Sequence, residues 1–126
     1  MADQQVIKVA LIEDDHMLSD MYKIKFEKEG FAIATAADGA EGLEVVEKEQ
    51  PDIILLDVIM PRMDGFQTLQ ELRARGVRTP VILLTNLGQE EDIKKGRELG
   101  ATDYFVKSNF TPDAIVSKVR IVLQNS

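Results

Sequence analysis

The sequence predicts an α/β protein with a (βα)5 arrangement, in which five strands alternate with five helices and form a parallel sheet. Short apolar runs recur along the chain, and the segments between them carry apolar residues at helical spacing. Glycine or proline marks the ends of these segments. We expect a single domain over residues 1–126, with a core between about residues 6 and 123, because 126 residues with 44% hydrophobic content can bury one core.

The predicted strands are short and apolar. They cover residues 6–12, 31–36, 53–56, 81–84 and 104–106. The runs at 53–56 and 81–84 lack polar alternation, which is typical of parallel strands covered by helices on both faces.

The predicted helices are amphipathic, and each carries apolar residues on one face. These residues are Leu18, Met21, Tyr22 and Phe26; Leu43, Val45 and Val46; Phe66, Leu69 and Leu72; Ile93 to Leu99; and Ile115, Val119 and Val122. Signals for the helix ends are Gly30, Gly76 and Gly100 after the first, third and fourth helices, Gln50-Pro51 after the second, and Thr111-Pro112 at the start of the fifth. Right-handed crossovers then favour the flavodoxin-like strand order 2-1-3-4-5, with a ligand crevice at the carboxyl ends of the central strands.

Composition narrows the function classes. The 15 basic and 22 acidic residues give a net charge of −7, which opposes direct binding to nucleic acid or to an anionic membrane. The absence of cysteine excludes disulfides, thiolate metal sites and a cysteine nucleophile. No signal peptide or membrane-spanning run is recognisable, so we expect a soluble, cytoplasmic protein.

Polar residues follow four of the five predicted strands. Glu13-Asp14-Asp15 follows the first strand, Asp57 the third, Thr85 the fourth and Lys107 the fifth. Because the carboxyl ends of parallel strands meet at one edge of the sheet, we expect these groups to converge. Taken singly, each has an ordinary structural explanation as a helix cap, a strand terminus or a solvated charge.

The expected carboxylate cluster favours a divalent cation. Two unit charges ~4 Å apart repel by about 4 kcal/mol at an effective dielectric of 20, so neighbouring Glu13, Asp14 and Asp57 would need a proton or a cation between them. Oxygen ligands that leave water positions free suit Mg²⁺. With Lys107 as an anion contact and Thr85 as a hydroxyl donor, the set fits phosphoryl transfer to a carboxylate, and Asp57 is the favoured acceptor.

At these residues the sequence resembles the receiver domain of bacterial two-component response regulators, from about residue 6 to residue 123. The stretches that carry the resemblance are VALIEDD (9–15), ILLDVIMPRMDG (54–65), LLT (83–85) and GATDYFVK (100–107). The resemblance implies a phosphorylation-controlled switch and not an enzyme in the ordinary sense. It further implies that Asp57 accepts a phosphoryl group from a sensor histidine kinase or a histidine phosphotransfer protein.

The resemblance also implies roles for the other residues of the site. Glu13, Asp14, Asp57 and the backbone carbonyl of Ile59 would bind Mg²⁺, and Lys107 would contact a phosphoryl oxygen. Thr85 would hydrogen-bond the phosphoryl group, and Tyr104 would change rotamer. The surface of the fourth helix, fifth strand and fifth helix would then be read by a downstream protein or output domain, and a dimer through that surface is an open alternative.

Three departures from the family pattern modify these expectations. Ser108 follows the lysine where most members have proline, which leaves the isomer of the Lys107–Ser108 bond open. Asn86 replaces a commonly small residue after the switch threonine. Ile59 and Leu87 are apolar where family members often orient the water for hydrolysis, so we predict slow loss of phosphate from Asp57.

Other conspicuous residues are assigned ordinary roles. We expect His16 to be exposed at the start of the first helix without a chemical role, and Met17, Met21 and Tyr22 to pack in the core. Met60 and Met63 are candidates for an exposed patch beside Asp57. Ile121 falls outside the apolar stripe of the last helix and should be exposed.

Two other function classes, an adaptor and a true enzyme, fit the sequence less well. A phosphorylation-independent adaptor would keep the fold and use it only for protein contacts, but the acceptor, the acidic pair and the lysine are all present. An aspartate-nucleophile phosphohydrolase would need a second acid at position 59, where the chain has isoleucine. A flavin-binding electron carrier would need a phosphate-binding loop after the first strand, where Glu13-Asp14-Asp15 would repel the anion.

Overall fold

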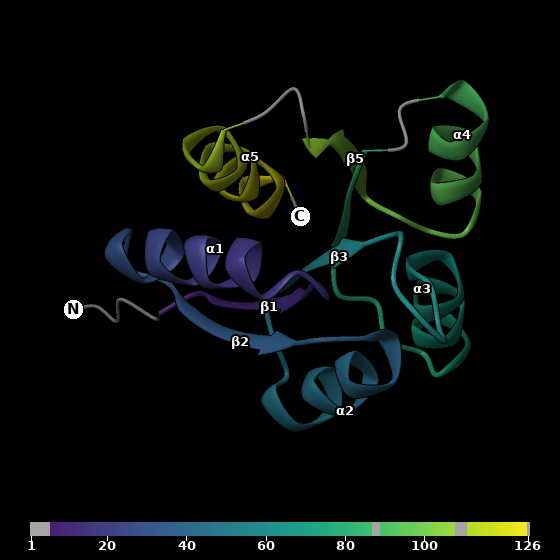
Figure 1. Ribbon diagram of the computed structural model, residues 1–126, viewed down its shortest axis with the longest axis horizontal. Helices are drawn as coiled ribbons and strands as arrows, with labels where there is room; N and C mark the ends of the chain where they lie inside the picture. Colours follow the sequence, from purple (N-terminus) through teal and green to yellow (C-terminus); the bar gives the residue numbers. More distant parts are fainter. Residues whose placement is uncertain (1–5, 87–88, 108–110, 126) are drawn as a thin grey trace.

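The computed structural model describes residues 6–86, 89–107 and 111–125 as ten alternating elements (Figure 1). The strands are β1 (Lys8–Ile12), β2 (Ala32–Ala36), β3 (Ile53–Asp57), β4 (Val81–Thr85) and β5 (Asp103–Val106). The helices are α1 (His16–Lys28), α2 (Gly39–Glu49), α3 (Gly65–Ala74), α4 (Glu90–Glu98) and α5 (Pro112–Gln124).

The strands form one parallel sheet in the order β2-β1-β3-β4-β5, which confirms the predicted flavodoxin-like topology. In the register of the sheet Ile12 pairs with Leu56, Asp57 pairs with Leu84, and Thr85 pairs with Val106. The carboxyl ends of β1, β3, β4 and β5 therefore lie at one edge.

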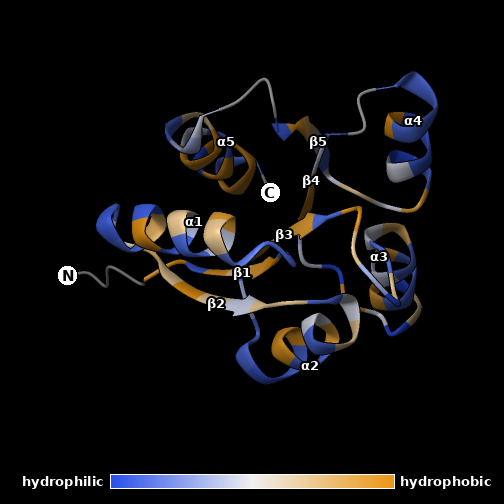
Figure 2. Cartoon of the chain, viewed as in Figure 1, coloured by the Kyte–Doolittle hydropathy of each residue, from blue (hydrophilic) through white to orange (hydrophobic). Residues whose placement is uncertain are grey.

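Two apolar layers cover the two faces of the sheet. Alternate strand residues such as Val9 and Leu11 pack with α1 and α5, whereas Ala10 and Ile12 pack with α2 and α3. Figure 1 shows α1 and α5 on one side of the strands and α2, α3 and α4 on the other. Burial on both faces explains why β3 and β4 show no polar alternation over residues 53–56 and 81–84 (Figure 2).

The predicted helix ends are confirmed by the backbone. Gly30, Gly76 and Gly100 have φ values of 93°, 82° and 103°, a region that favours residues without Cβ. Gln50 ends α2 in the left-handed region at φ 49°, directly before proline. Thr111 caps α5 by accepting a hydrogen bond from the Ala114 backbone N–H, 3.2 Å away.

The structure corrects some boundaries. Strand β1 begins at Lys8, and Val6 is 63% exposed ahead of it. Strands β3 and β4 each extend one residue further than predicted, so Asp57 and Thr85 are the last residues of their strands. Both polar side chains are consequently held by the sheet ladder and not by a loop.

The expected core packing of Met17 and Met21 is wrong. Met17 is 84% exposed and Met21 is 42% exposed, while Tyr22 and Phe26 are buried. A residue one position before the buried stripe is rotated by about 100° around the helix, which is enough to turn it outward. With Ile24, 66% exposed, the two methionines form an apolar stripe on the outer face of α1.

Two further expectations can be judged. Met60 is 8% exposed and packs in the core, so the expected exposed patch with Met63 is wrong; Met63 is itself half-buried. Ile121 is 49% exposed, as predicted. Among the helices of the described residues, none has the length and hydrophobicity that a membrane crossing requires.

Candidate functional site

Three carboxylates meet where β1 and β3 end. Glu13 follows β1, and its backbone N–H donates to the Ala36 carbonyl oxygen at 2.9 Å, which continues the sheet by one residue. Glu13 and Asp57 are buried, whereas Asp14 is exposed. One oxygen from each of Glu13, Asp14 and Asp57 lies within 4.8 Å of the others, so the predicted convergence is confirmed for these acids.

Lys107, just after β5, reaches across the edge of the sheet to this cluster. Its Nζ donates to Glu13 Oε1 at 2.5 Å and lies 3.3 Å from Asp57 Oδ2. The lysine side chain is mostly buried, with 13% of it exposed. One cation therefore offsets the charge of two buried acids in this arrangement.

The charges of the cluster shift its pKa values. Burial, followed by the charge of Glu13, raises the pKa of Asp57 to about 7, although Lys107 opposes the shift. Burial disfavours the charge on Lys107, but its hydrogen bond to Glu13 and the charge of Asp57 outweigh that effect and raise its pKa. An additional cation would relieve the repulsion that holds the Asp57 pKa high.

The loop after Asp57 is fixed by two close contacts. Gly65 starts α3, and a Cβ at this position would lie 2.3 Å from the Asp57 carbonyl oxygen, so only glycine allows the approach. Arg62 adopts φ 67° and forms an ion pair with Asp38 at 2.6 Å, while Asp38 also caps α2. The loop that carries Ile59 is thus anchored at both ends.

A cleft of about 360 Å³ opens over the cluster. Its lining includes all three acids, Lys107, Thr85, Ile59 and Asn86. Thr85 is fully buried from its position at the end of β4, and Ile59 is 57% exposed at the rim. The cleft is polar inside, and its exposed rim combines Ile59 with the polar residues Asp14, Asp15 and Asn86.

Tyr104 lies outside the lining of this cleft, beneath α4. Its side chain is 8% exposed, and burial together with the charge of Asp92 raises the pKa of the phenol to about 12. Residue Leu83 is its partner in the register of β4 and β5, two positions before Thr85. The candidate switch tyrosine is therefore separated from the acids but connected to Thr85 through one strand.

Several residues around the site were not anticipated. Burial raises the pKa of Tyr22 on α1, and the charges of Lys107, Glu13 and Asp57 also act on the phenol. The Arg62–Asp38 pair joins residues 24 positions apart, and no sequence pattern indicated it.

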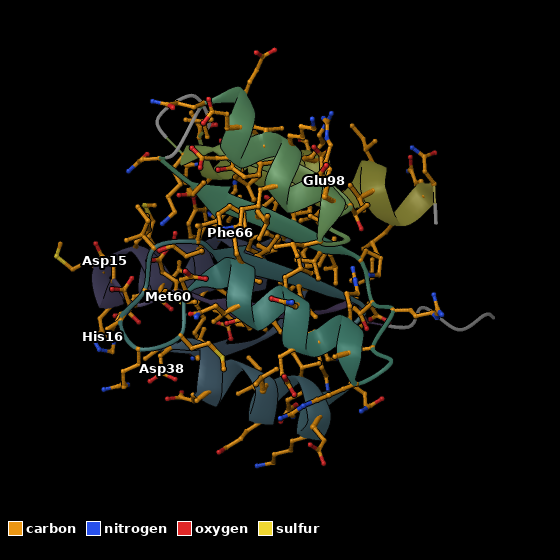
Figure 3. The ribbon with its side chains drawn as sticks, turned by 90° about the vertical axis from the view of Figure 1, so that its right-hand side faces the viewer. Asp15, His16, Asp38, Met60, Phe66 and Glu98 are labelled. Atoms are coloured by element: carbon orange, nitrogen blue, oxygen red, sulfur yellow. The ribbon has the colours of Figure 1, made fainter. Side chains whose placement is uncertain are left out.

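His16 is exposed at the first position of α1, as expected (Figure 3). Asp15, His16, Asp38 and Met60 lie toward the same edge of the molecule in Figure 3. The expectations about Ser108 and Leu87 lie outside the described residues.

The sheet order and the acidic cleft over Glu13, Asp14 and Asp57 are consistent with a signalling switch of the receiver type. Residues 9–120 match the model of the response regulator receiver domain, and the chain belongs to that family. Among curated proteins it is 34% identical to the alkaline phosphatase synthesis transcriptional regulatory protein PhoP of Bacillus subtilis and 40% identical to the transcriptional regulatory protein CpxR of Escherichia coli. Both alignments cover 94% of this chain, which spans about half of each relative, 49% and 50% respectively.

Solved structures agree with this assignment. The Francisella response regulator 1452 receiver domain has a TM-score of 0.88 at 34% identity, with 94% of this chain and 98% of that chain covered. The chemotaxis protein CheY4 of Vibrio cholerae has a TM-score of 0.88 at 31% identity, with coverage of 94% and 99%. The acidic cleft is consistent with the phosphorylated aspartate site of such domains.

The raised Asp57 pKa predicts a pH-dependent stability difference between wild type and Asp57→Asn without Mg²⁺. Between about pH 4 and pH 7 the folded wild type keeps a proton that the unfolded chain has lost, so its stability falls as the pH rises. The free energy of unfolding of the variant should therefore rise relative to that of wild type between about pH 4 and pH 7, by at most about 4 kcal/mol. Above about pH 7 the difference should not change further. Urea denaturation in EDTA at several pH values measures the difference.

Asp20→Asn is the matched control, because Asp20 is an exposed acid on α1 away from the cluster. This control shows how much of the change comes from removing any acidic side chain, and the gain of Asp57→Asn should exceed it. A constant difference for Asp57→Asn would show that Asp57 is not held in a proton-binding environment.

Proposed function

We propose that this receiver domain accepts a phosphoryl group on Asp57 from a phosphohistidine of a sensor kinase or phosphotransfer protein, in a Mg²⁺-dependent reaction. The observation that carries the proposal is the meeting of three carboxylates within 4.8 Å under a cleft, with Lys107 bridging two of them. A purely structural acid cluster would gain nothing from this crowding, since each buried charge is costly.

The donor set fits a magnesium ion. The three carboxylates and the Ile59 backbone carbonyl would supply oxygen ligands only, which is the chemistry that Mg²⁺ favours. When bound, the ion would neutralise charge on the cluster and on the phosphoryl oxygens. The anchored loop between Asp57 and Gly65 limits the positions that the Ile59 carbonyl can take.

The transfer step assigns a role to each side chain. An Asp57 carboxylate oxygen attacks phosphorus, and the phosphorus–nitrogen bond of the donor breaks, so that its electron pair stays on the imidazole nitrogen. Lys107 contacts a phosphoryl oxygen, for which it must loosen its short hydrogen bond to Glu13. The Thr85 hydroxyl donates to another phosphoryl oxygen.

The output would follow from Thr85. Movement of its side chain changes the space beside Leu83 and Tyr104 and biases the surface of α4, β5 and α5 toward one of two states. A downstream protein or a covalently attached output domain would read that surface, and no direct contact of this domain with nucleic acid is proposed. We propose a cytoplasmic location on the same family basis.

Incubation with acetyl phosphate and Mg²⁺ tests the acceptor. Wild type should gain the mass of one acid-labile phosphoryl group, while Asp57→Asn should not, because the amide lacks the nucleophilic carboxylate. Intact mass measurement gives the yield, and EDTA should abolish it. Asp20→Asn should label like wild type.

An equal adduct in Asp57→Asn would place the acceptor elsewhere. No adduct in wild type with acetyl phosphate or with any of a panel of phosphorylated histidine-kinase cores would instead favour the phosphorylation-independent adaptor.

The outer face of α1 supports a protein donor. Met17 lies in the first turn of α1, two residues after Asp15 of the cleft lining, and Met21 and Ile24 continue its apolar stripe for about 10 Å. Ile59 exposes a fourth apolar side chain at the rim of the cleft. A donor that brings its histidine to Asp57 must pass over this rim, so we propose that a helix of the donor packs against the stripe.

Met17→Ser should slow phosphotransfer from a histidine-kinase core that labels wild type, by roughly tenfold, the effect of losing about 1.4 kcal/mol of apolar contact. It should leave labelling by acetyl phosphate unchanged, because a small donor does not reach the stripe. Val6→Ser is the matched control, since Val6 is also apolar and exposed, 63% against 84% for Met17, but precedes β1 at the opposite edge of the sheet. Equal slowing by both variants, or none by Met17→Ser, would contradict the docking assignment.

Slow hydrolysis of the aspartyl phosphate is expected from Ile59. Its side chain stands at the rim of the cleft and has no group that can orient the attacking water. Ile59→Asn should shorten the half-life of the phosphorylated form roughly tenfold, as followed by intact mass after removal of acetyl phosphate. A wild-type half-life of seconds in Mg²⁺, unchanged by substituting both Ile59 and Leu87, would contradict this expectation.

A further inference from the structure

Helix α4 rests on the sheet at a glycine. Its sequence is strongly polar (Figure 2). Gly96 is the one buried residue of this helix. Glycine weakens a helix interior relative to alanine, so its presence there calls for a packing reason. The packing reason is visible directly beneath it.

Two side chains leave no room for a Cβ at Gly96. A Cβ built there would lie 2.6 Å from Leu83 Cδ1, 3.2 Å from Tyr104 Cδ2 and 3.6 Å from Tyr104 Cε2. Leu83 is fully buried and pairs with Tyr104 in the register of β4 and β5, so the two side chains lie next to each other under the helix.

Tyr104 extends along the underside of α4. Asp92, one helical turn before Gly96 and so on the same face, is the acid whose charge acts on the phenol. The Lys95 ammonium of α4 lies 4.8 Å from the centre of the Phe66 ring of α3, a cation–π contact that joins the two helices. The helix is thus seated by neighbours on two sides, and the space left for the Tyr104 ring is set at Gly96.

We infer that Gly96 is the positioning residue that keeps Tyr104 beneath α4, and that a single methyl group at this position shifts Tyr104 toward solvent. A methyl group at position 96 fits only if Leu83 or Tyr104 moves, or if α4 shifts away from the sheet and loses its contact with Phe66. Both side chains belong to the same apolar cluster, but Tyr104 keeps 8% of its surface exposed whereas Leu83 has none, so the tyrosine ring is the group that can move outward. This inference rests on the proposed function only for its signalling consequence.

The test follows the Tyr104 ring by ¹⁹F NMR of protein labelled with 3-fluorotyrosine. The chain has two tyrosines, so Tyr22→Phe leaves Tyr104 as the single label. A soluble gadolinium chelate reports exposure of the ring through enhanced relaxation. Gly96→Ala should raise that enhancement at least about twofold, which corresponds to a shift of population and not to unfolding.

Rescue distinguishes the contact from a general weakening of the helix. Leu83→Val removes the Cδ1 atom that lies 2.6 Å from the built Cβ, so the double variant Gly96→Ala/Leu83→Val should return the enhancement toward the Gly96 value. Arg97→Ala, an exposed neighbour on α4, should leave Tyr104 protected. An unchanged Tyr104 in Gly96→Ala, or no return in the double variant, overturns the inference; so does failure of the double variant to fold.

The signalling consequence is measured separately. If Tyr104 and Asp57 belong to one two-state equilibrium, a shifted Tyr104 population changes the fraction of molecules in the state that phosphorylates readily. The rate at which acetyl phosphate labels Asp57 should therefore change, and the double variant should restore that rate. Loss of labelling in wild type would overturn the proposed function but leave the NMR result standing. A Tyr104 shift with an unchanged labelling rate would overturn the coupling of Gly96 to Asp57.

Discussion

The structure depends on the placing of three carboxylates at one edge of a parallel sheet. Glu13 and Asp57 are buried at the ends of neighbouring strands, and Lys107 arrives from β5 to offset their repulsion. The sheet ladder fixes Asp57 in a position that its own charge disfavours, which the raised pKa records. The buried charges therefore destabilise this edge of the sheet. Binding of a cation or a phosphoryl group would change that destabilisation, which is how a local charge change can drive a switch.

Much of this arrangement could be predicted from the sequence. The apolar strands, the glycines after the helices and the acids after β1 and β3 each reflect a local constraint, so the topology and the carboxylate cluster followed from pattern alone. The exposed face of α1 could not be predicted, because Met17 and Met21 lie one position from the buried stripe and have the same hydrophobicity as core residues. Met60 shows the reverse case of a loop residue that the fold buries.

The contacts that anchor the site were also beyond sequence reasoning. Arg62 meets Asp38 across 24 positions, and Lys107 meets Glu13 across 94 positions. Pairs of this kind arise only when the tertiary structure brings two helix ends or strand ends together. The resemblance to receiver domains supplied the role of Lys107, but it said nothing of a bond between its ammonium and Glu13 in place of an equal contact with Asp57.

That asymmetry bears on how the two ends of the switch communicate. Lys107 follows Val106, which pairs with Thr85, and Tyr104 lies two residues further back on the same short strand. Any movement of Lys107 from Glu13 toward a phosphoryl oxygen would act on the carboxyl end of β5. Near the other end of the strand, Gly96 of α4 confines the Tyr104 side chain. Strand β5 has only four residues, and each of them is paired with β4. The buried charge of Lys107 and the absence of a side chain at Gly96 thus constrain the same strand, β5.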